Sequence, residues 1–106
     1  MKPMHVQYSG RLCVVATSLY GNRRLALILV DRQRDERVCV ATVNFPGVEN
    51  NLQEGEFLVL NDEDAVGVLD VLSAADIVHP IGTTLKTPSG RIAHVCIKGL
   101  SYEDGL

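Results

Sequence analysis

The residues best suited to chemistry are the cysteines and histidines, and their spacing matches no metal site. The only close pair among them is His94 and Cys96, which are separated by one residue. Structural zinc sites favour pairs of ligands separated by about two to four residues. We therefore expect no metal ligands and no cofactor. The six residues are Cys13, Cys39, Cys96, His5, His79 and His94.

His94 and Cys96 are also the best pair for nucleophilic catalysis. Side chains two residues apart on a strand lie about 7 Å from each other, which is farther than the hydrogen bond that a general base requires. All three cysteines have apolar neighbours, which is typical of buried thiols. We therefore expect no catalytic residues and no enzyme. An enzyme that uses His79, His94 or Cys96 would need two of these side chains in one cleft.

Other motif classes are missing as well. The chain has no glycine-rich phosphate-binding motif. Its isoelectric point of about 5.5 and its five aromatic residues without tryptophan disfavour direct nucleic-acid binding. No run of about eighteen apolar residues predicts a transmembrane helix, and the first residues lack the apolar core of a signal peptide. We therefore expect a cytoplasmic protein with no membrane partner.

Charge is strongly segregated along the 106 residues, although the net charge is only −3. Residues 38–85 contain eight acidic residues and no Lys or Arg, whereas residues 1–37 contain seven basic and three acidic residues. If the eight acids share one surface, that surface would attract a basic protein. Alternatively, basic residues fold over the acids and neutralise them, with Arg23, Arg24, Lys86 and Arg91 as candidates. The acids are Glu49, Glu54, Glu56, Asp62, Glu63, Asp64, Asp70 and Asp76.

Four segments in the first part of the chain have the composition of β-strands. Residues 11–20, 23–31 and 37–45 are rich in apolar and β-branched types, and the polar connection between the last two predicts a hairpin. Pro46 and Gly47 then end the third strand and open a polar loop. Residues 56–60 predict a fourth, shorter strand.

The second part of the chain predicts one helix and one clear strand. The helix is expected over 62–75, because apolar residues recur there at spacings of three and four and acidic residues occupy its first turn. Residues 77–81 are expected to be extended, and 82–90 to form a loop. The last strand covers 91–98, with Ala93, Val95 and Ile97 as its inward face.

These elements predict a single α+β domain over residues 1–106. We expect a mainly antiparallel sheet of five to six strands with the 62–75 helix packed on it. Residues 1–9 and 101–106 are expected to be loose tails. Exposed sheet edges would also allow a homodimer.

Three motifs resemble those of a family of small bacterial proteins. The motifs are the strand Arg23–Leu27, the segment from Thr42 to Gly47, and an acidic helix in which Leu69, Leu72 and Ala75 precede Ile77 and Val78. The family is domain of unknown function four thousand three hundred and thirteen, met on plasmids, conjugative elements and phages. The resemblance covers about residues 20–100 and implies mobile-element cargo that binds host proteins. The family has no assigned activity, so the resemblance implies no site residues.

Two functional hypotheses follow from these observations. The first is a non-enzymatic accessory factor, such as a mobile-element or phage inhibitor, that binds a basic host protein through the eight acidic residues. The second is a module that binds a small molecule or a peptide in a pocket between helix and sheet. A ligand-induced rise in melting temperature would support the second.

Overall fold

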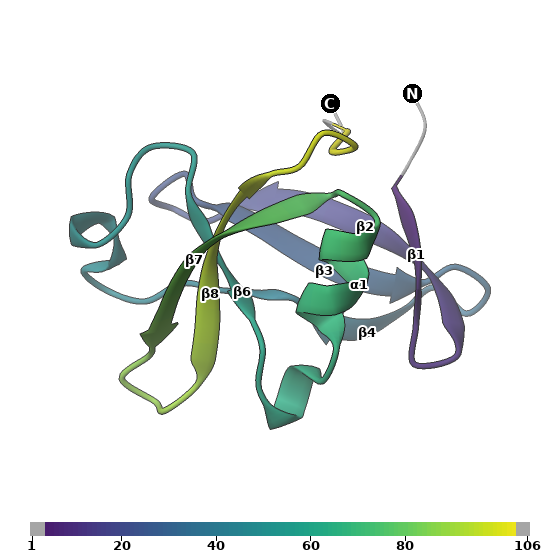
Figure 1. The fold of residues 1–106 in the computed structure, drawn as a ribbon. Helices are drawn as coiled ribbons and strands as arrows, with labels where there is room; N and C mark the ends of the chain where they lie inside the picture. Colours follow the sequence, from purple (N-terminus) through teal and green to yellow (C-terminus); the bar gives the residue numbers. More distant parts are fainter. Residues whose placement is uncertain (1–3, 104–106) are drawn as a thin grey trace.

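Two four-stranded antiparallel sheets and one short α-helix make up the fold (Figure 1). The computed structural model describes residues 4–103, without the side chain of Glu49. The first sheet has the order β1 (His5–Tyr8), β2 (Arg11–Leu19), β3 (Leu25–Asp31), β4 (Glu36–Val40). The second has the order β5 (Thr42–Val43), β6 (Phe57–Leu60), β8 (Ile92–Lys98), β7 (Val78–Lys86). The α+β class is therefore confirmed, with eight strands in place of five to six.

The two sheets are joined at Ala41, between β4 and β5. The Ala41 N–H donates to the Leu27 carbonyl in the first sheet at 2.8 Å, and the Ala41 carbonyl accepts the Leu60 N–H of the second at 2.8 Å. The buried Thr42 hydroxyl accepts the Leu27 N–H at 3.1 Å and is hydrogen-bonded to the Tyr20 hydroxyl at 3.1 Å. The single strand predicted over 37–45 was therefore wrong, because its chain leaves one sheet and enters the other.

The predicted helix over 62–75 is interrupted. A 3₁₀ turn, η2 (Glu63–Ala65), comes first, and the α-helix α1 (Val68–Ala74) follows it. Gly67, which the sequence places inside the helix, precedes α1 with a φ of 75°. Because this left-handed conformation suits glycine and interrupts a right-handed helix, Asp62 caps η2 instead of α1, and Glu63 and Asp64 lie in the first turn of η2.

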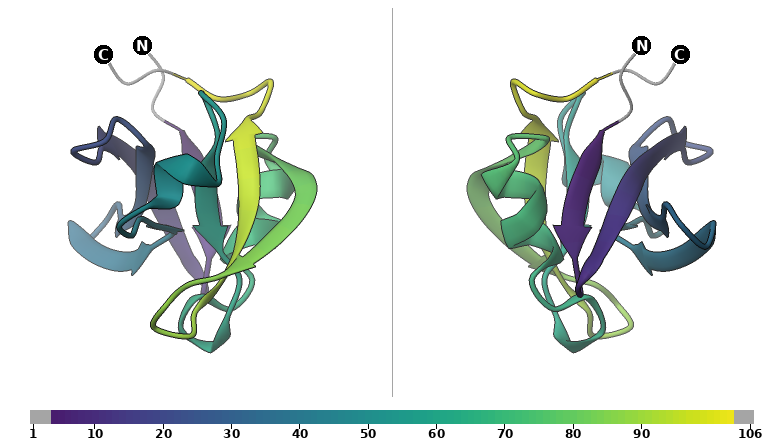
Figure 2. Two further views of the ribbon diagram at one scale, coloured as in Figure 1. Left: turned by 90° about the vertical axis from the view of Figure 1, so that its left-hand side faces the viewer. Right: turned by 90° about the vertical axis from the view of Figure 1, so that its right-hand side faces the viewer.

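The helix α1 fills the gap between the free edges of the two sheets. It contacts β1 at the edge of the first sheet and β7 at the edge of the second (Figure 2). Val68, Leu69 and Leu72 are the buried residues of this helix. The sheets, joined on one side at Ala41 and on the other through α1, thus enclose one hydrophobic core. Among the described residues, no helix is long and apolar enough to cross a membrane.

Strand β7 is longer than predicted, because residues expected in a loop continue it to Lys86. Its pairing with β8 shifts register between Pro80 and Thr84. On β8, Ala93 and Val95 are buried as predicted, whereas Ile97 is 38% exposed and Cys96 is fully buried. Cys96 is flanked by residues of both neighbouring strands, Phe57 and Pro80, which explains its burial on the face expected to be outward.

The chain ends are only partly described. Residues 5–8, assigned by the sequence to a loose tail, form β1 and pair with β2, and both Met4 and Val6 are buried. At the other end, the Ser101 N–H donates to the Asp76 carbonyl at 2.8 Å. The sequence missed β1 because its four residues, 5–8, are too few to show the alternating pattern of a strand. The remaining parts of both predicted tails, 1–3 and 104–106, lie outside the described residues.

Replacing Thr42 with valine tests the junction between the sheets. We expect T42V to lower the free energy of unfolding by about 1–3 kcal/mol, because the buried Leu27 N–H loses its acceptor. Urea unfolding measures the change, with the exposed Thr83 changed to valine as the control. Equal losses in the two variants would contradict the role of the Thr42 hydroxyl.

Candidate binding site

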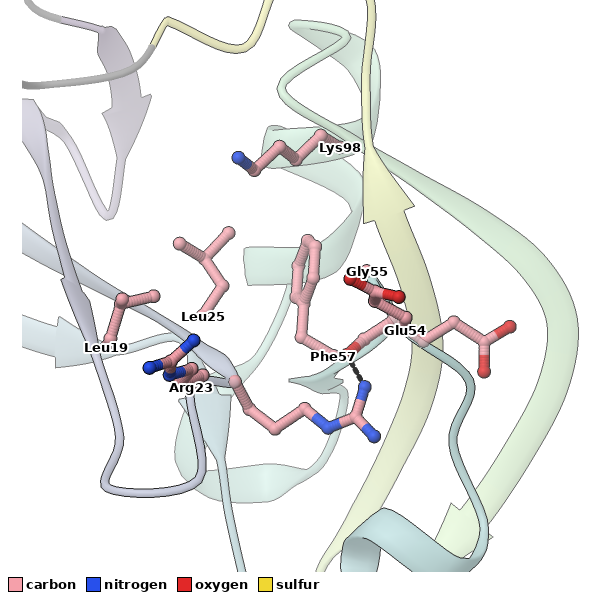
Figure 3. Close-up of a pocket in the computed structure, with 9 residues that line it drawn as sticks. Leu19, Arg23, Leu25, Glu54, Gly55, Phe57 and Lys98 are labelled. Atoms are coloured by element: carbon pink, nitrogen blue, oxygen red, sulfur yellow. Dashed lines mark hydrogen bonds between the residues drawn. The ribbon is translucent and has the colours of Figure 1, made fainter.

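A pocket of about 240 Å³ opens between the two sheets (Figure 3). Its walls are the turn between β2 and β3 in the first sheet, the loop before β6, and the end of β8 in the second sheet. We name it the inter-sheet pocket. It is lined by Leu19, Arg23, Arg24, Leu25, Glu54, Gly55, Glu56, Phe57 and Lys98.

The floor of the inter-sheet pocket is apolar. Leu25 from β3 and Phe57 from β6 are buried, and Figure 3 shows their side chains facing each other across the pocket. Leu19 extends this surface outward and is 62% exposed. A leucine this exposed beside an apolar floor can gain contacts when another apolar group enters.

Arg24 holds one wall of the pocket in place. Its guanidinium donates to the carbonyls of Leu52 at 3.1 Å and Glu56 at 3.0 Å, and also to the carbonyl of Gln53. The Glu56 carboxylate in turn accepts the Gln53 N–H at 2.7 Å. Both side chains thus hold the loop in its conformation through hydrogen bonds to its backbone.

The other charged side chains at the rim, Arg23, Glu54 and Lys98, differ in the contacts they make. Within residues 4–103, the side chains of Arg23 and Glu54 form no hydrogen bond or ion pair. Figure 3 shows the Glu54 carboxylate directed away from Phe57. The Lys98 ammonium lies 4.7 Å from the centroid of the Tyr102 ring. Arg23 is therefore the rim cation whose side chain has no partner among the described residues, whereas Lys98 is engaged with Tyr102.

The cysteine thiols lie in surroundings that suppress reactivity. Cys96 is fully buried, and burial raises its pKa to about 12. Burial also raises the pKa values of Cys13 and Cys39. Because the thiolate is the reactive form, the cysteines suit packing better than nucleophilic catalysis.

The histidines do not converge with a thiol in one cleft. The Cys96 sulfur donates to the His94 carbonyl at 3.6 Å and makes no hydrogen bond to its ring. The His94 ring lies instead between the Asn61 amide nitrogen at 3.1 Å and the Thr84 hydroxyl at 3.4 Å. His79 lines a different cavity. The described residues contain no cluster of His, Cys, Asp and Glu that could hold a metal ion.

Asp62 is the most strongly engaged of the eight predicted acidic residues. Arg91 donates to it twice, from Nε at 2.8 Å and from a terminal nitrogen at 3.0 Å. This hydrogen bonding holds the pKa of Asp62 below its usual value. The Asp62 carboxylate also accepts the Asp64 N–H at 3.1 Å, capping η2.

The acidic residues are divided between different parts of the molecule. Glu54 and Glu56 line the inter-sheet pocket before β6, whereas Asp62, Glu63 and Asp64 follow that strand at its other end (Figure 1). Asp76 lines a separate cavity with His79 and Lys98. Glu63, Asp64 and Asp70 are exposed, and the Glu49 side chain lies outside the description.

Sequence reasoning missed most of the inter-sheet pocket. Glu54 and Glu56 were among the predicted binding residues, but the apolar floor and the cations at its mouth were not. The sequence carried no local signal for the pocket, since the positive φ of Arg23, 68°, appears only in the structure. Comparison with known protein families, curated proteins and solved structures finds no match for this chain. The family resemblance therefore stays a prediction.

Replacing Arg24 with lysine tests the wall of the pocket. We expect R24K to lower the free energy of unfolding by about 1–2 kcal/mol, since lysine keeps the charge and cannot reproduce the fork of donors. Thermal unfolding measures the loss, with exposed Arg34 changed to lysine as the control. Equal effects in both variants would refute the role of the guanidinium.

Asp62 predicts a specific acid sensitivity. Because its pKa is lowered in the folded state, its pairing with Arg91 stabilises the fold above the unfolded-state pKa of about 4. This contribution is lost as pH falls through the lower folded-state pKa. We expect D62N to have a lower free energy of unfolding than the parent at pH 7. The difference between the two free energies should become smaller below about pH 4. Exposed Glu63, changed to glutamine, is the control in urea titrations, and a gap that ignores pH would contradict the pairing.

Proposed function

We propose that the protein is a non-enzymatic binding module that accepts an apolar side chain of a partner polypeptide in the inter-sheet pocket. The observation that carries the proposal is the pairing of an apolar floor with an exposed, uncommitted cation at the rim. Leu25 and Phe57 supply the floor, and Arg23 supplies the cation. Protein interfaces combine an apolar centre with a polar rim in the same way.

The size of the pocket favours a single side chain over a whole cofactor. Drug-sized ligands occupy about 300–1,000 Å³, and the inter-sheet pocket has a volume of about 240 Å³. It lies at the open end between two sheets, a position where β-barrel-like folds commonly take ligands. The second sequence hypothesis assigned a pocket to the space between helix and sheet, and the inter-sheet pocket has no residue from α1.

A partner attracted through the eight acidic residues has less support. Asp62 is paired with Arg91, and Glu56 is hydrogen-bonded to the loop that contains it. Glu63 and Asp70 are exposed, and strand β6 separates them in the chain from Glu54. The host-protein target and the mobile-element role implied by the family resemblance stay predictions.

The experiment is a screen of ten-residue peptides, blocked at both ends, against the ¹⁵N-labelled full chain by NMR. We expect peptides with large apolar residues to shift the amide signals of Leu25 and Phe57. Replacing Leu19 with serine should weaken the best peptide about tenfold to a hundredfold, since its burial contributes about 1.5–3 kcal/mol. Leu12 is a matched control, because it lies on the same strand, is 38% exposed and lines a different cavity.

Three outcomes would overturn the proposal. One is the absence of any binding peptide. Another is an equal loss of affinity in L19S and L12S. The third is binding that shifts only signals around Glu63 and Asp70 and vanishes at high salt, which would favour the acidic residues as the recognition surface.

A further inference from the structure

We infer that the partner polypeptide binds as an extended strand added to the free edge of β2, antiparallel to it, with an apolar side chain opposite Leu19 at the mouth of the inter-sheet pocket. The inference rests on the proposed function and specifies how the partner binds at the same pocket. It is carried by backbone groups of β2 that have no partner among the described residues, on an edge without the features that protect the other sheet edges.

β2 is longer than the strand that covers its outer edge. β1 has four residues and β2 has nine, and the pairing of the two strands ends at Val14. One further hydrogen bond follows, from the Val15 N–H to the Met4 carbonyl at 2.8 Å. On its other side β2 pairs with β3 as far as Leu19. Within the described part of the chain, residues 16–19 therefore have a neighbouring strand on one side only, and β2 continues past β1 (Figure 2).

The hydrogen bonds of β2 show which of its residues point toward this free edge. The Arg32 N–H donates to the Leu12 carbonyl at 3.0 Å just beyond the end of β3, so Leu12 faces β3, whereas the Val15 N–H faces β1. Because backbone groups alternate in direction along a strand, the N–H and carbonyl groups of Thr17 and Leu19 also point away from β3. No backbone partner for these groups occurs among residues 4–103.

The other sheet edges carry features that hinder the addition of a strand. In β7 the pairing register shifts between Pro80 and Thr84, and proline and bulges are both common protections of an edge. β4 begins with Glu36 and Arg37 and has a shift of register against β3. β1 is contacted by α1, and β5 has only two residues. These features disfavour pairing with another chain.

The free edge of β2 lacks such protection. Its sequence is Ala-Thr-Ser-Leu over 16–19, with no proline, glycine or charged residue, and its register against β3 is regular. Ser18 is exposed, and Leu19 is 62% exposed. An unprotected edge is a template for pairing with another strand. Through Thr17 and Leu19 it offers both donors and acceptors to such a strand.

A strand added at this edge brings a side chain to the inter-sheet pocket. Leu19 shares its face of β2 with the buried Val15 and Cys13, and it lines the pocket together with Leu25. Residues directly opposite each other in an antiparallel pair have their side chains on the same face, with Cβ atoms about 4.5–5.5 Å apart. The partner residues opposite Thr17 and Leu19 therefore share this face. Recognition by an added strand combines backbone hydrogen bonds with pockets for alternate side chains in the same way.

The experiment uses the peptide acetyl-Lys-Thr-Val-Thr-Leu-Thr-Lys-amide, whose two apolar residues lie at alternate positions. Its binding to the full chain is measured by NMR titration. We expect acetyl-Lys-Thr-Thr-Val-Leu-Thr-Lys-amide, which has the same composition, to bind about tenfold more weakly. Its two apolar residues are adjacent, so they face opposite sides of a strand and only one of them reaches the apolar face.

N-methylation of single residues in the first peptide separates strand addition from docking by side chains alone. Because the residues opposite Thr17 and Leu19 direct their N–H groups toward β2, N-methyl-valine or N-methyl-leucine should weaken binding about tenfold. N-methylation of the threonine between them is the matched control, since its N–H faces away from β2. This control should change the affinity by less than about twofold.

Amide hydrogen exchange tests the edge itself. In the free chain we expect the amides of Thr17 and Leu19 to exchange rapidly and those of Ala16 and Ser18 slowly, because only the latter face β3. The first peptide at saturation should slow the exchange of Thr17 and Leu19 by about tenfold or more. T17P removes the outward N–H and should weaken the peptide about tenfold or more, with T17A, which keeps that N–H, as the control.

The outcomes distinguish this inference from the proposed function. If the amides of Thr17 and Leu19 already exchange slowly in the free chain, or if the three N-methylated peptides bind alike, strand addition at β2 is wrong. The binding module stands in that case, provided that the blocked peptides shift Leu25 and Phe57 and are weakened by L19S. If no peptide of either set perturbs Leu25, Phe57 or Thr17, the inference and the proposed function both fail.

Discussion

The hydrogen bonds around Ala41 determine how the two sheets are arranged. The N–H of this residue pairs with Leu27 in the first sheet and its carbonyl with Leu60 in the second. A strand that leaves its sheet exposes the neighbouring backbone groups, and buried groups without partners are costly. The Thr42 hydroxyl helps to meet this constraint, since it accepts the Leu27 N–H. The crossing between sheets is thus possible with its buried hydrogen bonds satisfied.

The inter-sheet pocket follows from the same junction. Leu25 begins β3 two residues before Leu27, and Phe57 begins β6 three residues before Leu60, so both floor residues are close in the chain to the hydrogen bonds that join the sheets. Both strands approach Ala41 from these first residues, and Leu25 and Phe57 line the pocket. Loss of register at the junction would therefore displace the floor residues as well. This connects the stability of the fold to the shape of its binding site.

The sequence predicts local elements well where one segment carries the whole signal. Residues 11–20 and 56–60 form strands as expected, because β-branched and apolar types there have no competing turn signal. The helix over 62–75 fails at Gly67, where apolar periodicity continues through a residue that the backbone uses to change direction. The change of sheet at Ala41 has no local signal at all, since an alanine inside a strand-like run looks the same whether its partners lie in one sheet or two. The pocket is hidden for the same reason, because it joins segments far apart in the chain.

Charge is segregated along the chain in part because basic residues of other segments contact the acidic middle segment in the folded protein. Asp62 lies in the acidic middle, and the cation that pairs with it, Arg91, comes from the following strand region. Arg24 comes from the basic first third and donates to carbonyls in the acidic loop before β6. The acidic middle segment, which has no Lys or Arg of its own, is thus contacted by two arginines from elsewhere in the chain. Arg91 pairs with a carboxylate, whereas Arg24 donates to backbone carbonyls. The eight acidic residues thus differ in how they are engaged, and Arg23, from the same basic turn as Arg24, lies at the rim of the inter-sheet pocket.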